Sequence, residues 1–400
     1  MTDSAGKALG PGLGASATGD GLVRRRRRRM VRGTALGLAV FFTAAAGTGW
    51  ALYARLSANI TPDDAAAREL ARYERERPTE LVRGAQNILL IGSDTRAGRG
   101  NSAYGRDLGS ERSDTTILLH LAADRRSATA VSLPRDLMVD IPGCRQADGG
   151  HSEPVFAMFN HAFLLGGSAC TIRTVEKLTD IRVDHHVVVD FSGFKEMVDA
   201  VDGVQVCLKE PVDDKDAKLK LPAGKVMLDG EQALGYVRAR KSIGDGSDTE
   251  RMERQQRFLG ALVDKMQSSD VLLNPVKLYP VLDAATSSLT TDPELASLHG
   301  LYQLVRGLRN IPIERVQFLT VPRESYVYDS NRDQLVEPEA EKLFARLRAD
   351  QPLAVAQNPP RETPADFSQP DGKGDPSPGP GGPSPVPTFR GNTAAEHTCE

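Results

Sequence analysis

The sequence predicts an α/β fold with a mixed central sheet that is covered by helices on both faces and preceded by a transmembrane helix. Short continuous apolar runs at 87–91, 115–121 and 128–133 are typical of strands buried on both faces. Helical spacing of apolar residues appears between later runs, and this alternation favours an α/β domain. With 400 residues and a hydrophobic fraction of 40%, the chain can form a sizeable core.

We expect the folded domain to occupy residues 85–349. A hairpin turn is expected at Asp124-Arg125-Arg126, between the second and third strands. Helical spacing predicts helices at 154–165 and 169–178, with Gly166-Gly167 as the stop between them. The later elements are predicted in this order: strand 185–190, helix 191–201, strand 204–208, helix 248–267, helices 275–285 and 293–309, strand 316–321 and helix 337–349.

An uncharged segment near the N-terminus, residues 34–53, predicts a membrane anchor. Twenty residues of helix rise roughly 30 Å, the thickness of a bilayer's hydrocarbon core. The preceding run Arg24–Arg29 keeps the N-terminus in the cytoplasm by the positive-inside rule, and Trp50 and Tyr53 suit the far interface. The alternative is a cleaved signal peptide, which Ala44-Ala45-Ala46 would suit. Both interpretations place the main domain outside the cytoplasm.

Three further segments are predicted from composition. Residues 1–33 are rich in small residues and then arginine, and are expected to be a disordered, basic cytoplasmic tail. Residues 54–84 are charged and are expected to form a stalk, while the Pro-, Gly- and Ser-rich residues 350–400 are expected to be a disordered tail. The formal net charge of −3 argues against nucleic acid as a partner.

The four cysteines show no spacing that suggests a zinc site. Cys144 and Cys170 bracket one segment, while Cys207 and Cys399 stand apart from them. In an oxidising compartment a Cys144–Cys170 disulfide is plausible, and two separate buried thiols are the alternative.

Two acids adjoin the ends of predicted strands. Asp94 follows the strand at 87–91 after Gly92-Ser93, and Asp114 immediately precedes the strand at 115–121. If these strands are antiparallel neighbours, both acids lie at one edge, where open α/β sheets bind ligands. Two carboxylates beside a phosphate site are best reconciled by a hard divalent cation, Mg²⁺ or Mn²⁺. The alternative is that each acid only caps a turn.

Arginines gather near the same predicted edge. Arg135 ends a buried strand beside Pro134, and Arg238 and Arg240 alternate along a segment that we expect to be extended. Guanidinium groups match phosphate oxygens and stay charged, so the cluster predicts a phosphate or pyrophosphate site rather than solvated surface arginines. The candidate ligands of this anion are Arg112, Arg135, Arg238, Arg240, Arg251, Gln255 and Gln256.

Other polar residues give weaker signals. Asn160 is a candidate polar contact at the mouth of a pocket, while His161 is interpreted as structural. No GxSxG or GxxxxGK[ST] motif is present, which weakens serine-hydrolase and nucleotide-kinase interpretations.

Seven segments together resemble the LytR-CpsA-Psr family, and they keep its order without a gap across roughly residues 85–270. The segments are NILLIGSD at 87–94, RSDTTILLHL at 112–121, SLPRD at 132–136, FNHAFLLGG at 159–167, FSGFKEMVDAVDGVQV at 191–206, LDGEQALGYVRAR at 228–240 and DTERMERQQ at 248–256. The arginine- and alanine-rich style suggests a high-GC Gram-positive source such as an actinobacterium.

The resemblance implies a membrane-anchored phosphotransferase that moves a glycopolymer from a polyprenyl-pyrophosphate carrier onto a peptidoglycan sugar hydroxyl. By the same resemblance, Asp94 and Asp114 are the catalytic acids that hold the metal, and Arg135, Arg238 and Arg240 bind the pyrophosphate. The family fold also implies an apolar cavity for the polyprenyl chain. Two alternatives stay open: a polyprenyl-pyrophosphate hydrolase that uses water, and a non-catalytic binder of anionic lipid or wall polymer.

Overall fold

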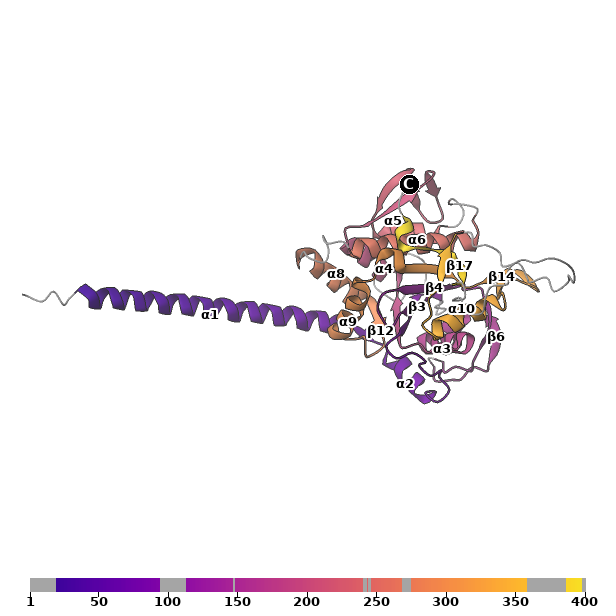
Figure 1. The fold of residues 1–400 in the computed structure, drawn as a ribbon, viewed down its shortest axis with the longest axis horizontal. Helices are drawn as coiled ribbons and strands as arrows, with labels where there is room; N and C mark the ends of the chain where they lie inside the picture. The colour runs from indigo at the N-terminus through magenta and orange to yellow at the C-terminus, as the bar shows by residue number, and fades with distance from the viewer. Residues whose placement is uncertain are drawn as a thin grey trace, which may run out of the picture. The chain divides into compact units, whose positions relative to one another are not determined.

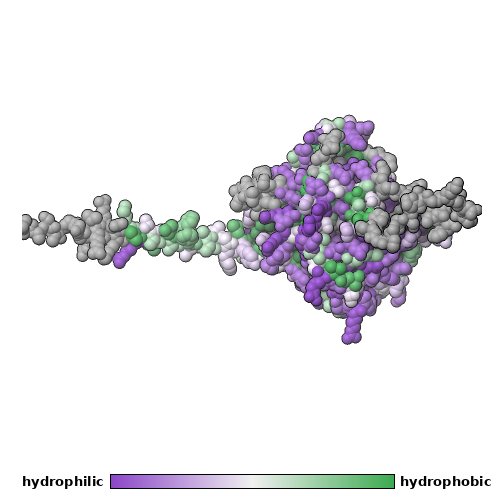
Figure 2. Space-filling view, viewed as in Figure 1, coloured by the Kyte–Doolittle hydropathy of each residue, from purple (hydrophilic) through white to green (hydrophobic). Residues whose placement is uncertain are grey.

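The computed structural model describes residues 19–93, 113–146, 148–239, 243, 246–267, 275–357 and 386–397. The chain divides into two units, residues 1–55 and 56–400. In the first unit the structure describes helix α1 (Gly19–Asn59), whose last residues begin the second unit. Its segment Met30–Asn59 is long and apolar enough to cross a membrane, and Figure 2 shows its apolar residues in green.

The expected disorder of residues 1–33 is wrong from Gly19 onward, because α1 already includes the arginine run. Arginine is a good helix former, so the helix of the apolar segment extends back through Arg24–Arg29. The predicted transmembrane segment, residues 34–53, lies wholly within α1.

The second unit is built on a central sheet, which has nine strands in the described part of the chain. Its inner pairs β2–β3 and β3–β4 are antiparallel, whereas β2–β7 and β4–β13 are parallel, so the predicted mixed sheet is confirmed. In spatial order the strands are β1 (Thr61–Pro62), β12 (Leu289–Thr291), β7 (His185–Val189), β2 (Gln86–Ser93), β3 (Ser113–Leu121), β4 (Ala128–Leu133), β13 (Val316–Thr320), β17 (Thr388–Thr393) and β16 (Ala354–Ala356).

Helices cover both faces of this sheet, as Figure 1 shows. Successive side chains of a strand point to opposite faces, so Leu89 and Ile91 pack on one side and Ile88 and Leu90 on the other. The first face carries α2 (Asp64–Arg72), α3 (His161–Thr179) and α10 (Glu339–Arg348). The opposite side carries α4 (Phe191–Ala200), α5 (Gly230–Arg238), α6 (Asp248–Gln267), α8 (Pro275–Ser288) and α9 (Leu298–Arg309).

Four strand pairs and two 3-10 helices complete the described elements. The pairs are β5 (Met138–Ile141) with β6 (Val155–Met158), β8 (Val204–Leu208) with β11 (Gly224–Leu228), β9 (Val212–Asp214) with β10 (Leu219–Leu221), and β14 (Arg323–Tyr326) with β15 (Asp329–Leu335). The 3-10 helices are η2 (Ile313–Arg315) and η3 (Ala394–His397).

The helix expected at 154–165 is wrong in its first part, because residues 155–158 form strand β6. Pairing with β5, which lies earlier in the chain, overrides the local helical spacing. The break expected at Gly166-Gly167 is confirmed as a kink inside α3, where Gly167 has a φ of 60°. That left-handed backbone suits glycine, which has no Cβ to clash.

The stalk expected at 54–84 is also wrong for much of its length, because these residues belong to the folded unit. Strand β1 pairs with β12, and α2 begins at a cap in which Asp63 accepts a bond from the Ala66 amide. Ala66 and Leu70 of α2 are buried in the core. The segment is rich in charged residues, but the apolar residues of α2 are spaced so that they form one buried face, as in an amphipathic helix.

The disorder expected for the C-terminal tail is also wrong in part. Part of residues 350–400 is ordered, because β16 and β17 join the central sheet and η3 follows β17. Residues 358–385, the richest in Pro and Gly, lie outside the described residues. Phe389 and Ala394 are buried, so this short segment contributes both backbone pairing and apolar contact.

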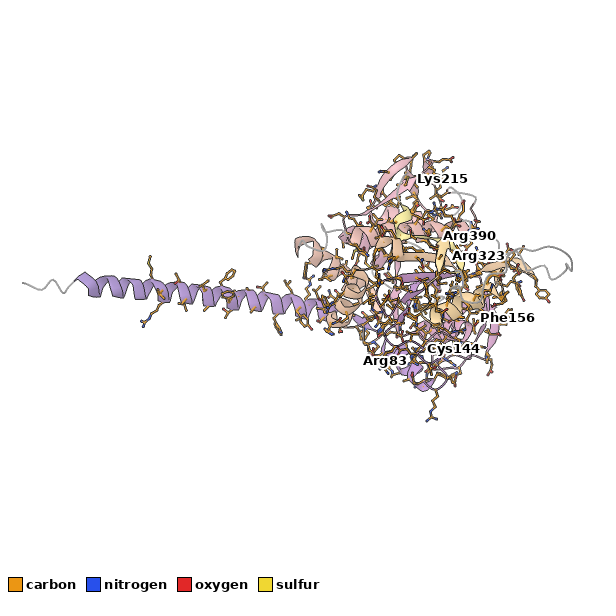
Figure 3. All side chains as sticks on the ribbon, in the orientation of Figure 1. Arg83, Cys144, Phe156, Lys215, Arg323 and Arg390 are labelled. Carbon is orange, nitrogen blue, oxygen red and sulfur yellow. A yellow bond between two sulfur atoms is a disulfide. The ribbon has the colours of Figure 1, made fainter. Side chains whose placement is uncertain are left out.

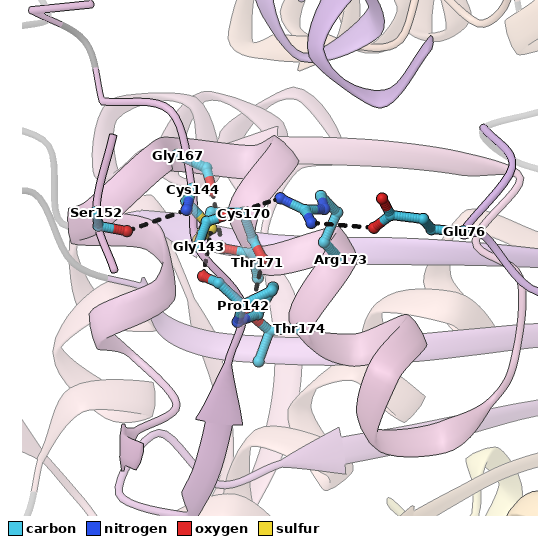
Figure 4. The surroundings of a disulfide bond; sticks show 10 residues. All are labelled: Glu76, Pro142, Gly143, Cys144, Ser152, Gly167, Cys170, Thr171, Arg173 and Thr174. Atoms are coloured by element: carbon cyan, nitrogen blue, oxygen red, sulfur yellow. Dashed lines mark hydrogen bonds and ion pairs between the residues drawn. A yellow bond between two sulfur atoms is a disulfide. The ribbon is translucent and has the colours of Figure 1, made fainter. Parts of the chain in front are cut away.

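The plausible Cys144–Cys170 disulfide is confirmed, and it fastens the segment after β5 to α3 (Figure 4). Nearby, Arg173 of α3 donates to the carbonyl of Gly143 at 2.6 Å and pairs with Glu76 at 3.5 Å. Cys207 of β8 is also disulfide-bonded. These bonds are compatible with an oxidising compartment.

Candidate active site

One edge of the central sheet collects the ends of five neighbouring strands. β2, β7, β4 and β13 all end there, and β3 begins there because it runs antiparallel to β2 and β4. The register places Ser93, the last residue of β2, opposite Ser113. The antiparallel pairing on which the two-acid prediction depended is therefore confirmed, and it brings Asp114 to this edge.

Three predicted site residues, Asp94, Arg112 and Arg240, lie outside the described residues. The convergence of Asp94 with Asp114 therefore stays a prediction.

Arg135 is held at this edge by two carboxylates. Its Nη1 donates to Asp114 Oδ1 at 2.9 Å, and its Nε donates to Asp136 Oδ2 at 3.2 Å. Burial lowers the pKa of the Arg135 guanidinium, but the charges of Asp136, Asp114 and Asp248 outweigh burial and raise the pKa above its ordinary value. The guanidinium is thus fixed in place and stays charged, as an anion clamp requires.

The start of α6 lies near Arg135, because the negative charge of Asp248 helps to raise the pKa of the Arg135 guanidinium. Asp248 Oδ1 lies 2.7 Å from Nη2 of Arg251, whose side chain is buried. Helix N-termini favour anions because their amides point outward and the helix dipole is positive there. Arg251 is thus placed at the beginning of α6, as the sequence suggested, with a carboxylate beside it.

Arg254 and Gln255 hold the end of α5 rather than pointing to Arg135. Arg254 Nε donates to the carbonyl of Tyr236 at 2.9 Å, and its Nη2 donates to the carbonyl of Ala239. Gln255 Nε2 donates to the carbonyl of Val237 at 3.2 Å. Both side chains therefore satisfy carbonyl groups that a helix leaves unpaired at its C-terminus.

The segment around Arg238 is helical, so the expected extended segment is wrong. Asp229 and Gln232 form a capping box that starts α5, and this local signal carries the helix to Arg238. The Arg238 guanidinium carbon lies 4.5 Å from the ring centre of Phe191, the first residue of α4 after β7. Arg238 is therefore at the β7 end of the edge, whereas Arg135 follows the end of β4.

A repeated pattern ends two parallel strands, and sequence reasoning missed it. Ser132-Leu-Pro-Arg-Asp136 follows the same pattern as Thr320-Val-Pro-Arg-Glu324, and Ser132 lies opposite Thr320 in the register. Gln256 Nε2 donates to the hydroxyls of Ser132 and Thr320, each at 3.1 Å. The buried amide of Gln256 therefore ties α6 to both strand ends.

Arg323 is the arginine of the second pattern, and its position corresponds to that of Arg135 in the first pattern. Its Nη2 donates to Thr249 Oγ1 at 2.6 Å, and its Nη1 pairs with Asp333. Burial raises the pKa of the Asp333 carboxyl, although Arg323 opposes that rise. Arg332 of β15 lies 3.5 Å from Asp136, which also binds Arg135. The next residue of β15, Asp333, pairs with Arg323, so this strand contacts both arginine-carboxylate groups. The repeated strand-Pro-Arg pattern was the signal that could have revealed Arg323.

Whether the site suits a divalent cation depends on which carboxylate oxygens are available as ligands. Oδ2 of Asp114 accepts no hydrogen bond from any residue that the structure describes. Within the described ranges, no group of three or more His, Cys, Asp or Glu side chains could hold a metal. A free carboxylate oxygen beside a second acid would suit Mg²⁺, which prefers oxygen ligands and keeps several waters.

A cavity of about 740 Å³ adjoins this edge. Its lining includes Thr249 and Gln256 of α6, the strand end at Thr320, and Arg323 and Asp333. Figure 3 shows Arg323 and Arg390 close together on the ribbon. The lining is largely polar and charged, so this cavity does not match the apolar chamber expected for a polyprenyl chain.

The comparisons with known proteins agree with this architecture. The sequence model of the LytR_cpsA_psr family matches residues 56–349. The chain belongs to the LytR-CpsA-Psr family. The "LytR-Csp2A-Psr enzyme from Actinomyces oris" has a similar fold, with a TM-score of 0.53 and 21% identity over 68% of this chain and 93% of that one. The predicted α/β fold is thereby confirmed as that of this family.

Two curated relatives are similar over most of the folded unit. The "Probable cell wall biosynthesis protein LcpB" of Corynebacterium glutamicum is 34% identical over 289 residues, which cover 70% of this chain and 65% of that protein. The "Polyisoprenyl-teichoic acid--peptidoglycan teichoic acid transferase TagT" of Bacillus subtilis is 31% identical over 333 residues, which cover 80% of this chain and 96% of that protein. The match thus spans slightly less than two thirds of the length of the corynebacterial protein.

Proposed function

We propose that this protein is a phosphotransferase that moves a glycopolymer from a polyprenyl-pyrophosphate carrier onto a sugar hydroxyl of peptidoglycan. The observation that carries the proposal is the Arg135 guanidinium, which is fixed between Asp114 and Asp136 at the sheet edge. The name of TagT supports the reaction class, because it describes transfer of teichoic acid from a polyisoprenyl carrier to peptidoglycan.

The chain's own residues would act mainly by binding and orienting charge. In the transfer, the sugar oxygen forms a bond to the phosphorus that bears the glycopolymer, and the bond to polyprenyl phosphate breaks. The hydroxyl proton passes to a carboxylate of this edge. Phosphoryl transfer is accelerated chiefly by positioning and by neutralising the phosphate oxygens, which Arg135, Arg251 and Arg238 can do. Arg240 is proposed to join them.

A divalent cation completes this proposal. Asp94 and Asp114 would hold Mg²⁺ or Mn²⁺, as their oxygen ligands suit a hard ion. When bound, the ion would neutralise phosphate charge beside the arginines. Without it, two carboxylates next to a pyrophosphate would repel the substrate.

The N-terminal helix supports a location at the membrane. We propose that α1 spans the bilayer once, with Arg24–Arg29 on the cytoplasmic side and the folded unit outside. This arrangement would keep the active site on the side of the membrane where peptidoglycan lies.

A reconstitution experiment tests the proposed function. The full chain in lipid vesicles is incubated with a polyprenyl-pyrophosphate-linked glycopolymer, with and without soluble peptidoglycan oligomers. Polymer attached to the oligomers supports transfer. Release of free phosphorylated polymer alone would instead identify a hydrolase, and binding of the donor without any product would identify a passive binder. Arg135→Ala serves as the inactive control.

A further inference from the structure

We infer that the 740 Å³ cavity beside Arg323 binds the sugars of the acceptor glycan, and that the C-terminal segment, residues 386–397, supplies one of its walls. This inference rests on the proposed function, because it names the site of the second substrate. The C-terminal wall of this cavity lies outside the family match, which ends at 349.

The C-terminal segment is an integral part of the folded unit. Strand β17 lies between β13 and β16, and a Cβ on Gly391 would come within 2.2 Å of the Phe318 carbonyl oxygen. Only glycine allows backbone to approach so closely there. On the other side, Ala394 of η3 is fully buried against α6, where a Cβ on Gly260 would lie 3.2 Å from its Cα.

The direction of β17 brings the segment to the active-site edge. β17 runs antiparallel to β13 with Gly391 opposite Leu319, so its first residues lie beside the end of β13. Arg390, Gly391, Asn392 and Glu396 consequently line the same cavity as Arg323 and Gln256. A segment far along the chain thus lines a cavity beside the edge at which we propose that phosphate binds.

The lining favours a hydroxyl-rich ligand of low charge. The lining carries four cations (Lys209, Arg257, Arg323 and Arg390) and four acids (Glu253, Glu324, Asp333 and Glu396), so its charges balance. Arg390 pairs with Glu253 at 2.9 Å, and Arg323 pairs with Asp333. A lining without net charge gives a polyanion no overall attraction. A lipid chain is disfavoured as well, because these charged groups would lose their water on its binding.

Asn392 supplies an independent sign that a polar ligand binds here. The residue is only 8% exposed and lines the cavity, yet its Oδ1 accepts no hydrogen bond from the described part of the chain. Buried carboxamides normally have partners, and a sugar hydroxyl is a suitable donor. Hydroxyls of Thr249, Thr320 and Ser325 offer further hydrogen bonds to a glycan.

The position of the cavity suits an attacking hydroxyl. Arg135 and Arg323 follow adjacent parallel strands in the same register, and adjacent strands lie about 4.8 Å apart. A sugar beside Arg323 can therefore reach a phosphate held by Arg135. The volume also lies within the roughly 300–1,000 Å³ that small-ligand pockets occupy.

Binding of glycan without donor tests this inference separately from transfer. The full chain in vesicles is titrated with soluble peptidoglycan glycan oligomers, using the wild type, Arg390→Ala, Asn392→Ala and the control Thr388→Ala. Thr388 is an exposed residue of the same strand that does not line the cavity. We expect glycan binding to weaken by about tenfold in the two cavity variants, because each loses a side chain that can form a hydrogen bond with the glycan. Binding should be unchanged in the control.

The steady-state constants give a second readout. The KM for the glycan acceptor should rise in Arg390→Ala while the KM for the lipid-linked donor stays the same. A rise in the donor KM alone would assign the cavity to the donor's polymer and overturn the inference. So would normal glycan binding in both folded variants. If Asn392→Ala does not fold, Arg390→Ala decides, because that side chain is 62% exposed and its loss should be tolerated.

If the wild type binds the oligomers with this dependence on Arg390 but transfers nothing, the glycan site is supported and the proposed function fails. If transfer occurs but glycan binding is indifferent to both substitutions, the proposed function stands and this inference fails.

Discussion

Arg135 donates to Asp114 across 2.9 Å, although 21 positions separate the two residues in the chain. The contact arises because β3 and β4 are antiparallel, so that the residue at the start of one strand meets the residue just after the other. A cation and an acid are thereby fixed together at the edge that receives phosphate in our proposal.

Replacing Arg135 by alanine should lower the rate of glycopolymer transfer by about 100-fold or more. A group that stabilises charge in the transition state lowers the activation barrier by roughly 3 kcal/mol, and the substitution removes this stabilisation. Arg135→Lys should recover only part of the rate, because lysine keeps the charge but not the planar fork. Transfer is measured with lipid-linked donor and peptidoglycan oligomers. Arg126→Ala, at the exposed hairpin on the opposite edge, is the control. Near-normal transfer in Arg135→Ala would contradict the assigned role.

Replacing Asp114 by asparagine should raise the Mg²⁺ concentration needed for half-maximal transfer, because a neutral amide binds a hard cation less strongly than a carboxylate. A chelator should abolish transfer by the wild type, and added Mg²⁺ or Mn²⁺ should restore it. The readout is a metal titration of the transfer rate, with the exposed turn variant Asp124→Asn as control. An identical metal requirement in Asp114→Asn and wild type would remove Asp114 from the metal site.

Arg323→Ala should reduce transfer by about tenfold, the cost of removing a charged hydrogen-bond donor from a part-buried site. The substitution also leaves Asp333 without its cation, and because Arg323 lowers the pKa of that carboxyl, the pKa should rise further. The measurement is the transfer rate as a function of pH. Arg315→Ala, an exposed change just before the same strand, should leave the profile unaltered. Equal profiles for both variants would show that Arg323 has no part in the reaction.

Arg254 should matter for stability. Arg254→Met removes a buried guanidinium that binds the carbonyls at the end of α5, and should lower the free energy of unfolding by about 3 kcal/mol. Thermal melting of the purified protein measures this loss. Arg257→Met, an exposed change on the same helix, provides the comparison. If both variants melt at the same temperature, the support of α5 by Arg254 is unimportant.

Asp63 should make the folded unit sensitive to acid. Burial raises the pKa of the Asp63 carboxyl, but hydrogen bonds from His186, Ser168 and the Ala66 amide outweigh burial and lower the pKa from 3.8 to about 2. A carboxyl whose pKa is lower in the folded state stabilises that state above pH 3.8, and this stabilisation is lost as the pH falls towards 2.

Melting temperatures recorded between pH 6 and pH 2 should therefore fall less steeply for Asp63→Asn than for the wild type, from a lower starting value. Asp64→Asn, at the neighbouring exposed position, should follow the wild-type curve. Parallel curves for Asp63→Asn and the wild type would show that this group does not carry the acid sensitivity.

Several elements could be predicted because their cause is local. The apolar runs at 87–91, 115–121 and 128–133 became β2, β3 and β4, since strands between two helical layers need apolar residues on both faces. Helix α5 was missed although its capping box is also local, because the alternation of Arg238 and Arg240 was interpreted as an extended segment.

Other elements depend on partners far along the chain. Residues 155–158 became a strand because β5 pairs with them, and residues 388–393 became a strand because β13 and β16 lie on either side. Residues 388–393 have no hydrophobic pattern that would reveal such pairing, and the apolar run at 155–158 was assigned to the helix expected at 154–165. The role of Arg323 was missed for a related reason, because its place beside Arg135 follows from the parallel register of β4 and β13.

The sequence by itself determined the α/β class, the membrane-length apolar segment and the family, because periodicity and short motifs are local properties of the chain. Only the tertiary structure decided that Asp114 meets Arg135, that Gln256 joins two strand ends, and that the last residues wall a cavity. Those relationships depend on strand order and register, which are set by packing between segments that the chain itself keeps far apart.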